Sequence, residues 1–137
     1  INDEEARQMS GEHSLVKAAR KILTMGPTYL IIKKGEHGAL LFDKNEQCFF
    51  APALPLEEVF DPTGAGDTFA GGFIGYLAKT KDLSFENMKR AIIYGSAFAS
   101  LTVEKFGTDN ITYLKQEDLN ARIDRFKALV QVVVRHL

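Results

Sequence analysis

The stretch from residue 61 to residue 72, DPTGAGDTFAGG, constrains this chain more than any other part of it. The stretch holds four glycines among twelve residues, together with two carboxylates, Asp61 and Asp67. A single turn needs only one or two glycines, because few of its positions require a positive φ. The length of the run therefore indicates a backbone conformation that serves more than a reversal of the chain.

Three common phosphate-binding glycine motifs do not fit this run. The dinucleotide motif GxGxxG matches Gly64 and Gly66, but Phe69 stands where its third glycine would let a helix approach a strand. The protein-kinase glycine loop fails at the same residue. The phosphate loop GxxxxGK[ST] fails because Gly72 and Phe73 replace its lysine and its hydroxyl.

The run instead predicts a turn that leads directly into a helix. The amides of Ala65, Gly66 and Asp67 would lie at the helix N-terminus, where the first N–H groups have no partner within the helix. Such amides form an anion site, and glycine lets a ligand approach the backbone. Asp67 at the rim of that site could accept the proton of a hydroxyl that attacks a phosphoryl group. The alternative is that Asp67 caps the helix and the glycines serve packing.

Composition excludes several classes of protein. A chain of 137 residues is expected to form one domain. Its 17 basic and 18 acidic residues give a net charge of −1, which provides no overall field for nucleic acid or an anionic membrane. No apolar run approaches the roughly 20 residues of a membrane span. We interpret the single cysteine, Cys48, as a small apolar strand residue in a reducing, cytoplasmic setting.

The periodicity of apolar residues predicts helices and strands in an order typical of α/β layered domains. Asn2 and Ser84 are the expected N-caps of the first helix and of the second helix after the glycine run. The expected helices cover residues 2–12, 14–25, 68–79, 84–107 and 115–137, and the expected strands cover 28–33, 38–42 and 47–51, the last two as a hairpin. The expected apolar helix faces are Leu15, Val16, Ala19, Ile22 and Leu23; Phe85, Met88, Ile92, Gly95, Ala99 and Thr102; and Leu119, Ile123, Phe126, Val130 and Val133.

The glycine run carries a resemblance to a known family. Residues 61–73, DPTGAGDTFAGGF, closely resemble the second signature of the ribokinase-like carbohydrate and nucleoside kinases, the PfkB family. Residues 2–5, NDEE, look like the family's NxxE motif, and IKKGEHGALLF is similar to the strand, glycine loop and strand before the signature. The resemblance implies the C-terminal half of a ribokinase-like layered α/β fold, with a small, incomplete sheet flanked by helices. The acceptor-binding N-terminal half is then missing, and we expect the 137-residue chain to be inactive by itself.

The resemblance also implies roles for individual residues in the transfer of the γ-phosphoryl group of ATP. Asp67 would be the base that deprotonates the acceptor hydroxyl, and the backbone of Gly64, Ala65 and Gly66 would form the anion hole. Asn2 and Glu5 would organise Mg²⁺. Further residues would line the nucleotide or contribute to a site for a monovalent cation such as K⁺: Lys33, Gly35, Gly38, Gly95, Ser96, Ala99 and Gly107 for the nucleotide, and Asp61 and Thr63 for the cation.

Several alternatives stay open at this point. Asn2 and Glu5 fit a helix cap as well as a metal role, and Gly95 and Ala99 fit tight helix packing as well as ligand contact. The whole chain could be a non-catalytic regulatory domain that binds a nucleotide or phosphate, or a packing-only fragment. The acceptor is expected to be a sugar or a nucleoside, and whether the whole protein forms a homodimer stays open at this point. Strand 28–33 is expected to leave an apolar edge, with its parallel partner in the missing half.

Overall fold

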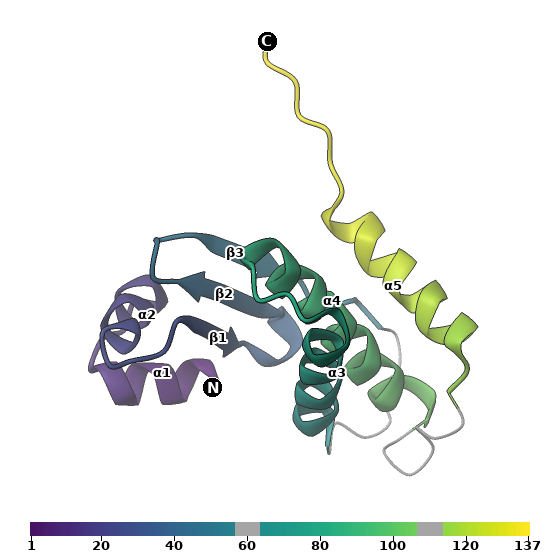
Figure 1. Ribbon diagram of the computed structural model, residues 1–137, viewed down its shortest axis with the longest axis horizontal. Helices are drawn as coiled ribbons and strands as arrows, with labels where there is room; N and C mark the ends of the chain where they lie inside the picture. The colour runs from purple at the N-terminus through teal and green to yellow at the C-terminus, as the bar shows by residue number, and fades with distance from the viewer. Residues whose placement is uncertain (57–63, 107–113) are drawn as a thin grey trace. The chain divides into compact units, whose positions relative to one another are not determined.

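A computed structural model of the chain describes residues 1–56, 64–106 and 114–137 (Figure 1). These residues form two compact units, Ile1–Ala53 and Leu54–Leu137, and each unit is described by itself. The elements appear in the predicted order. None of the helices in the described ranges is both long and apolar enough to cross a bilayer.

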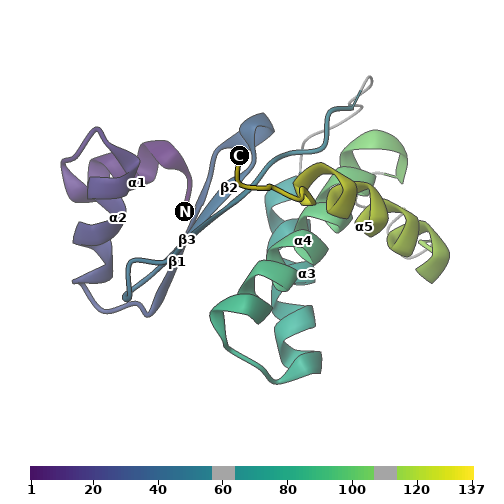
Figure 2. The same cartoon turned by 90° about the horizontal axis from the view of Figure 1, so that it is seen from above.

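The first unit is a three-stranded antiparallel sheet with two helices packed against one face. Helices α1 (Asp3–Ser10) and α2 (Leu15–Leu23) precede strand β1 (Tyr29–Lys33), the 3₁₀ turn η1 (Gly35–His37), and strands β2 (Ala39–Asp43) and β3 (Cys48–Ala51). The strand order is β1-β2-β3, and β2 and β3 form the predicted hairpin, in which Leu41 pairs with Phe49. Figure 2 shows both helices on the same side of the three strands.

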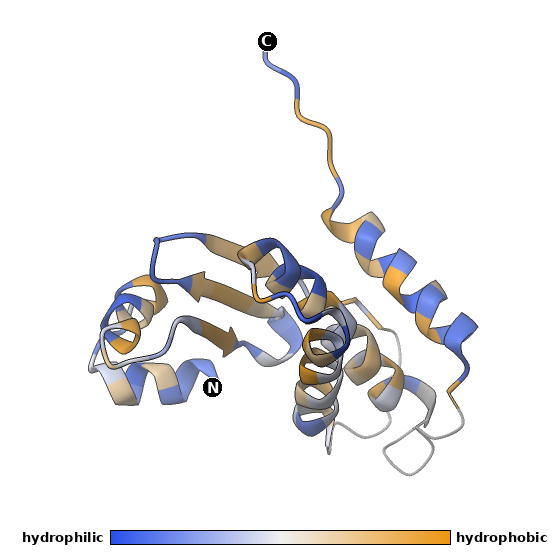
Figure 3. Ribbon diagram, viewed as in Figure 1, coloured by the Kyte–Doolittle hydropathy of each residue, from blue (hydrophilic) through white to orange (hydrophobic). Residues whose placement is uncertain are grey.

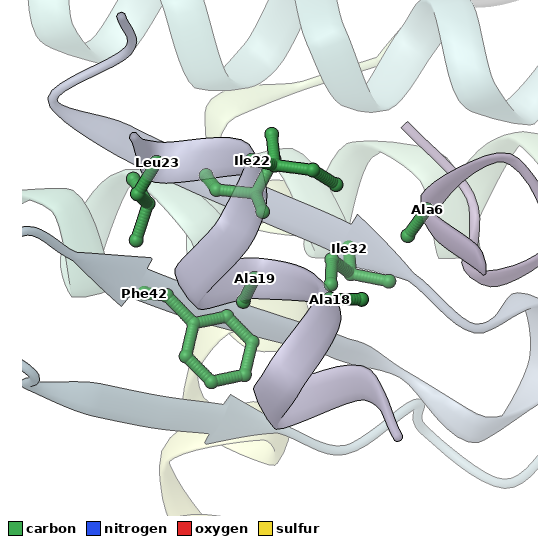
Figure 4. Packing of buried hydrophobic residues seen from close by; sticks show 8 residues of the cluster. Ala6, Ala18, Ala19, Ile22, Leu23, Ile32 and Phe42 are labelled. Atoms are coloured by element: carbon green, nitrogen blue, oxygen red, sulfur yellow. The ribbon is translucent and has the colours of Figure 1, made fainter. Parts of the chain in front are cut away.

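The core of this unit lies between the two helices and the sheet (Figure 4). Leu30 and Ile32 alternate along β1 onto the covered face, and Phe42 of β2 pairs with Leu30 in the ladder. The helices contribute mostly small side chains, which bring the backbones close: Ala6, Ala18, Ala19, Ile22 and Leu23 are all buried there. One prediction is wrong, because Val16 is exposed and Ala18 takes its place in the core.

Strand β1 is an edge strand, as predicted, but residues of the chain itself begin a parallel pairing with that edge. The amide of Lys33 donates to the carbonyl of Ile1 over 2.8 Å, and the N-terminal amine of Ile1 donates to the carbonyl of Ile31 over 3.2 Å. Asn2 and Lys33 form an isolated parallel bridge. The expectation that the parallel partner lies wholly outside the chain is therefore wrong for this end of the strand.

The second unit is helical. Helix α3 (Ala65–Thr80) packs along α4 (Phe85–Leu101), which continues into a π-helical turn, η2 (Thr102–Phe106). Helix α5 (Gln116–Val130) packs on α4 (Figure 1). The predicted N-cap of α4 is confirmed, because Ser84 Oγ accepts from the amide of Asn87. The core formed by these helices contains Ala97, Leu101, Leu119 and Phe126.

Helix α5 is shorter than the sequence predicts. It ends at Val130, and residues 131–137 follow without helical structure. The run Val132–Val133–Val134 explains the early end, since consecutive β-branched residues lose side-chain freedom in a helix. Val130 and Val133, expected on the buried stripe, are both exposed, and Figure 3 shows the apolar residues of this tail.

Candidate functional site

The start of α3 forms the predicted turn into a helix. Gly64 is the N-cap and has φ 82° and ψ −3°, in the left-handed region that glycine adopts readily. The first bond of the helix runs from the amide of Thr68 to the carbonyl of Gly64 over 2.9 Å, and the Thr68 hydroxyl donates to the same carbonyl. Ala65, Gly66 and Asp67 therefore occupy the three positions before the helical ladder begins.

The amides of Ala65, Gly66 and Asp67 are available to a ligand as far as the structure describes the chain. No described carbonyl or side chain accepts a hydrogen bond from any of them. Gly66 is exposed, and its missing side chain leaves the backbone open to solvent. Free amides at the positive end of a 16-residue helix attract an anion.

The carboxylate of Asp67 faces outward rather than into the protein. The residue is exposed, and its side chain forms no hydrogen bond or ion pair with the described residues. Had Asp67 capped its own helix or turned into the core, it could not act on a bound molecule. In this arrangement, a hydrogen-bond acceptor lies at one helix end next to amide donors that have no acceptor among the described residues. Such a pair can bind an anion and accept a proton from a neighbouring hydroxyl.

Asn2 and Glu5 form a reciprocal capping box at the start of α1. Asn2 Oδ1 accepts from the amide of Glu5 over 2.7 Å, and Glu5 Oε1 accepts from the amide of Asn2 over 2.9 Å. The helix-cap interpretation is therefore correct. It leaves Glu5 Oε2 outside the capping box, on an exposed side chain. Mg²⁺ prefers oxygen ligands and commonly keeps several waters, so one carboxylate oxygen here fits a role at or near such an ion.

The first unit brings Asn2, Lys33, Gly35 and Gly38 into one short region. Lys33 forms the parallel bridge to Asn2, and the turn η1 follows directly. Gly35 has φ 57° and Gly38 has φ 96°, both in the left-handed region. A Cβ at Gly38 would lie 2.1 Å from the carbonyl oxygen of Ala51, so no other residue fits there without displacing the backbone. The backbone at residue 38 lies so close to the backbone at Ala51 that only glycine fits at this position.

The small residues of α4 lie against α3. A Cβ at Gly95 would lie 2.6 Å from the carbonyl oxygen of Phe69, and Gly95 is buried. The packing alternative therefore accounts for Gly95, while Ser96 and Ala99 are half-buried on the same helix. Thr80 accepts from the Asn87 side chain at the far end of the pair, so the helices run antiparallel and the end of α4 lies beside the start of α3.

Three of the predicted site residues, Asp61, Thr63 and Gly107, lie outside the described residues. Within the described ranges, no three His, Cys, Asp or Glu side chains lie close enough together to hold a metal ion. Cys48 lies in a strand, as predicted, but it is exposed rather than part of the core.

Sequence reasoning missed the buried charge of Arg122. Arg122 lies in α5 on the face of Leu119 and Phe126, and only 6% of its side chain is exposed. A basic residue at helical spacing within an apolar stripe was the available signal. Its partners, Ser100 and Glu104, are 22 and 18 residues away in the sequence and could not be assigned from local pattern.

The chain is similar to known proteins in both sequence and fold. Residues 1–115 match the pfkB family carbohydrate kinases. The chain is 34% identical over 113 residues to a cytidine kinase of Thermococcus kodakarensis, covering 81% of this chain and 38% of the relative. It resembles the crystal structure of aminoimidazole riboside kinase from Salmonella enterica, complexed with aminoimidazole riboside and an ATP analog. That match has a TM-score of 0.72 at 30% identity and covers 90% of this chain and 40% of the other.

A second similar structure is that of a putative ribokinase II from E. coli in complex with ATP and Mg²⁺. The TM-score is 0.71 at 28% identity, over 90% of this chain and 38% of the other. The chain thus spans about two fifths of the length of the kinases it matches. The three-stranded sheet and five α-helices are a part of the ribokinase-like α/β fold, as far as the described residues show. Together with the family match over residues 1–115, this shows that the chain belongs to the pfkB family of carbohydrate kinases.

Proposed function

We propose that this chain supplies the nucleotide-binding and catalytic part of an ATP-dependent kinase that phosphorylates a hydroxyl of a sugar or nucleoside. The observation that carries the proposal is the start of α3, where an exposed Asp67 lies at the third position of a helix whose first amides donate to no described acceptor. Relatives and similar structures named as a cytidine kinase, an aminoimidazole riboside kinase and a putative ribokinase II support the reaction class. The free amides and the carboxylate support the residue roles.

In the transfer step, the Asp67 carboxylate and the backbone amides at the start of α3 act on different atoms. The Asp67 carboxylate accepts the proton of the acceptor hydroxyl, and the acceptor oxygen forms a bond to the γ-phosphorus of ATP. The bond between that phosphorus and the β–γ bridging oxygen breaks, and ADP leaves with its electron pair. The backbone amides following Gly64 donate to the transferred phosphoryl oxygens, whose charge they stabilise from fixed positions. A general base of this kind contributes roughly 10²- to 10⁴-fold in rate.

The cofactors follow from the same proposal. ATP is the phosphoryl donor, and Mg²⁺ would be held with the help of Glu5 and Asn2 and would neutralise charge on the nucleotide phosphates. A monovalent cation at Asp61 and Thr63 is proposed on the family resemblance alone. A cytoplasmic location and a homodimeric whole protein remain predictions from the sequence.

The metal role of Glu5 can be separated from its role in the helix cap. Glu5→Gln keeps the capping box, because a glutamine side chain accepts from the Asn2 amide as glutamate does. We expect this variant to retain the thermal stability of the chain while it raises the Mg²⁺ concentration needed for nucleotide binding. Glu4→Gln, an exposed neighbour outside the capping box, is the matched control. An unchanged Mg²⁺ requirement in Glu5→Gln would remove Glu5 from the metal site.

The main alternative is a regulatory domain that binds a nucleotide or phosphate without catalysis. A sensor has no use for a carboxylate that repels the phosphate it binds, and this disfavours the alternative. The intact gene product should phosphorylate at least one member of a panel of sugars and nucleosides, with ATP consumed only when that acceptor is present. Nucleotide binding without a phosphorylated product from any member would favour the regulatory domain.

A further inference from the structure

The buried guanidinium of Arg122 is a charge that the proposed reaction does not use. Its Nη1 donates to Ser100 Oγ over 3.0 Å, and its Nη2 donates to Glu104 Oε1 over 2.5 Å. Glu104 is itself only 21% exposed. Burying two charges is costly unless they are paired and hydrogen-bonded, so a solvent-exposed ion pair would be the simpler solution for stability alone. The position of this pair in the fold indicates a second purpose.

Arg122 joins three consecutive parts of the second unit. It belongs to α5, Ser100 belongs to the last turn of α4, and Glu104 belongs to the π-helical turn η2. The Ser100 hydroxyl donates to the Ala97 carbonyl, which leaves its oxygen lone pair for the guanidinium. The planar, two-pronged guanidinium therefore fixes the end of α4 and the turn after it relative to each other.

The segment held by Arg122 packs on the helix that carries Asp67. Thr102, where the helix changes to π geometry, donates its hydroxyl to the Phe98 carbonyl over 3.0 Å. The Phe98 ring lies against α3, since a Cβ at Gly72 would approach it to 2.9 Å. Residues of η2 also contact α3 directly. Contacts therefore lead from Arg122, through the end of α4 and η2, to the N-terminal half of α3.

We propose that Arg122 is a positioning residue for the anion site at the start of α3. It holds the Ser100–Glu104 segment in the one conformation that supports α3 beside Phe98, and so sets the direction of the amides of Ala65 to Asp67. π-Helical turns often occur at functional sites, which agrees with a positional role for η2. This inference rests on the proposed function, because it assumes that the site at α3 binds the nucleotide phosphates.

The test compares two variants of α5 that both weaken its packing on α4. Arg122→Met removes the guanidinium and keeps an apolar stem, whereas Phe126→Leu, four residues further along the same face, removes only apolar contact. Two quantities are measured on the 137-residue chain. The first is the hydrogen-exchange rate of the amides of residues 102–104, and the second is the affinity for Mg²⁺ with a non-hydrolysable ATP analogue.

We expect Arg122→Met to speed exchange at residues 102–104 and to weaken binding of the analogue, each by about tenfold. Phe126→Leu should leave both within about threefold, at an equal or larger loss of thermal stability. Arg122→Lys, which keeps the charge but not the two-pronged geometry, is expected to fold like the wild type and to give an intermediate loss of affinity. It keeps the inference testable if Arg122→Met does not fold.

Equal effects of Arg122→Met and Phe126→Leu on affinity would overturn the inference, because Arg122 would then serve stability alone. Wild-type affinity in Arg122→Met and Arg122→Lys would overturn it as well. A wild-type chain that binds no nucleotide would count against the proposed function instead. In that case, the exchange rates would still show whether Arg122 fixes the conformation of residues 102–104.

Discussion

The packing of α3 on α4 predicts opposite effects for two glycine-to-alanine substitutions. A Cβ at Gly95 would lie 2.6 Å from the Phe69 carbonyl oxygen, whereas an ordinary contact begins at 3.4 Å, so the helices must separate by about 0.8 Å. Alanine gains roughly 1 kcal/mol over glycine inside a helix, but overpacking costs about 1–3 kcal/mol. Because the obstacle is backbone rather than a flexible side chain, we expect Gly95→Ala to destabilise the chain by about 1–2 kcal/mol.

Gly75 provides the matched control, since it lies in α3 and a Cβ there would meet nothing within 4 Å. Gly75→Ala should therefore stabilise the chain by about 0.5–1 kcal/mol. Thermal unfolding followed by circular dichroism at 222 nm should separate the midpoints of the two variants by about 5–10 °C. A Gly95→Ala chain as stable as Gly75→Ala would refute the packing account and restore ligand contact as the reason for this glycine.

Three further predictions concern the ends and surface of the chain. Deleting residues 131–137 should leave the thermal midpoint within about 2 °C of the wild type, because Val132, Val133 and Val134 are largely exposed; a larger fall would mean that the tail packs on the protein. Partial burial raises the pKa of the Cys48 thiol, so alkylation by iodoacetamide at pH 7.5 should be slower in the folded chain than in urea; equal rates would contradict this. The Ser84 amide donates to the Asp82 carboxylate and lowers the pKa of Asp82. The stabilisation from this hydrogen bond is present above the unfolded pKa of Asp82 and is lost as pH falls through the pKa of Asp82 in the folded chain. Asp82→Asn should therefore lose less stability than the wild type on acidification. Equal losses of stability in the two proteins, measured by urea titration, would refute this prediction.

The order of helices and strands could be predicted because its signals are local. The N-caps Asn2 and Ser84 each accept a hydrogen bond from the amide three residues later in the sequence. A short polar turn joins the two strands of the hairpin, β2 and β3. The end of α5 was predicted wrongly because the apolar period continues to Val133, although three consecutive valines disfavour a helix. Periodicity indicates which face is apolar, but not whether a neighbour covers it.

The candidate site shows the same division between local and distant contacts. The turn at Gly64 and the exposed position of Asp67 follow from a few adjacent residues, and both were expected from the sequence. The role of Arg122 depends on partners in two other elements, and the packing role of Gly95 depends on Phe69 of the preceding helix. Asn2 and Glu5 remained ambiguous because a helix cap and a metal site use the same side chains, and the capping box does not exclude the second use.

The most direct test of the proposed base is the rate of phosphoryl transfer by the intact gene product carrying Asp67→Asn. This change keeps the shape of the side chain and removes its ability to take a proton. The account predicts a turnover loss of about 10²- to 10⁴-fold with ATP affinity changed only a few-fold, while Glu117→Gln, an exposed acid in the first turn of α5, turns over like the wild type. Undiminished turnover in Asp67→Asn would show that another group accepts the proton, and the central claim would be wrong.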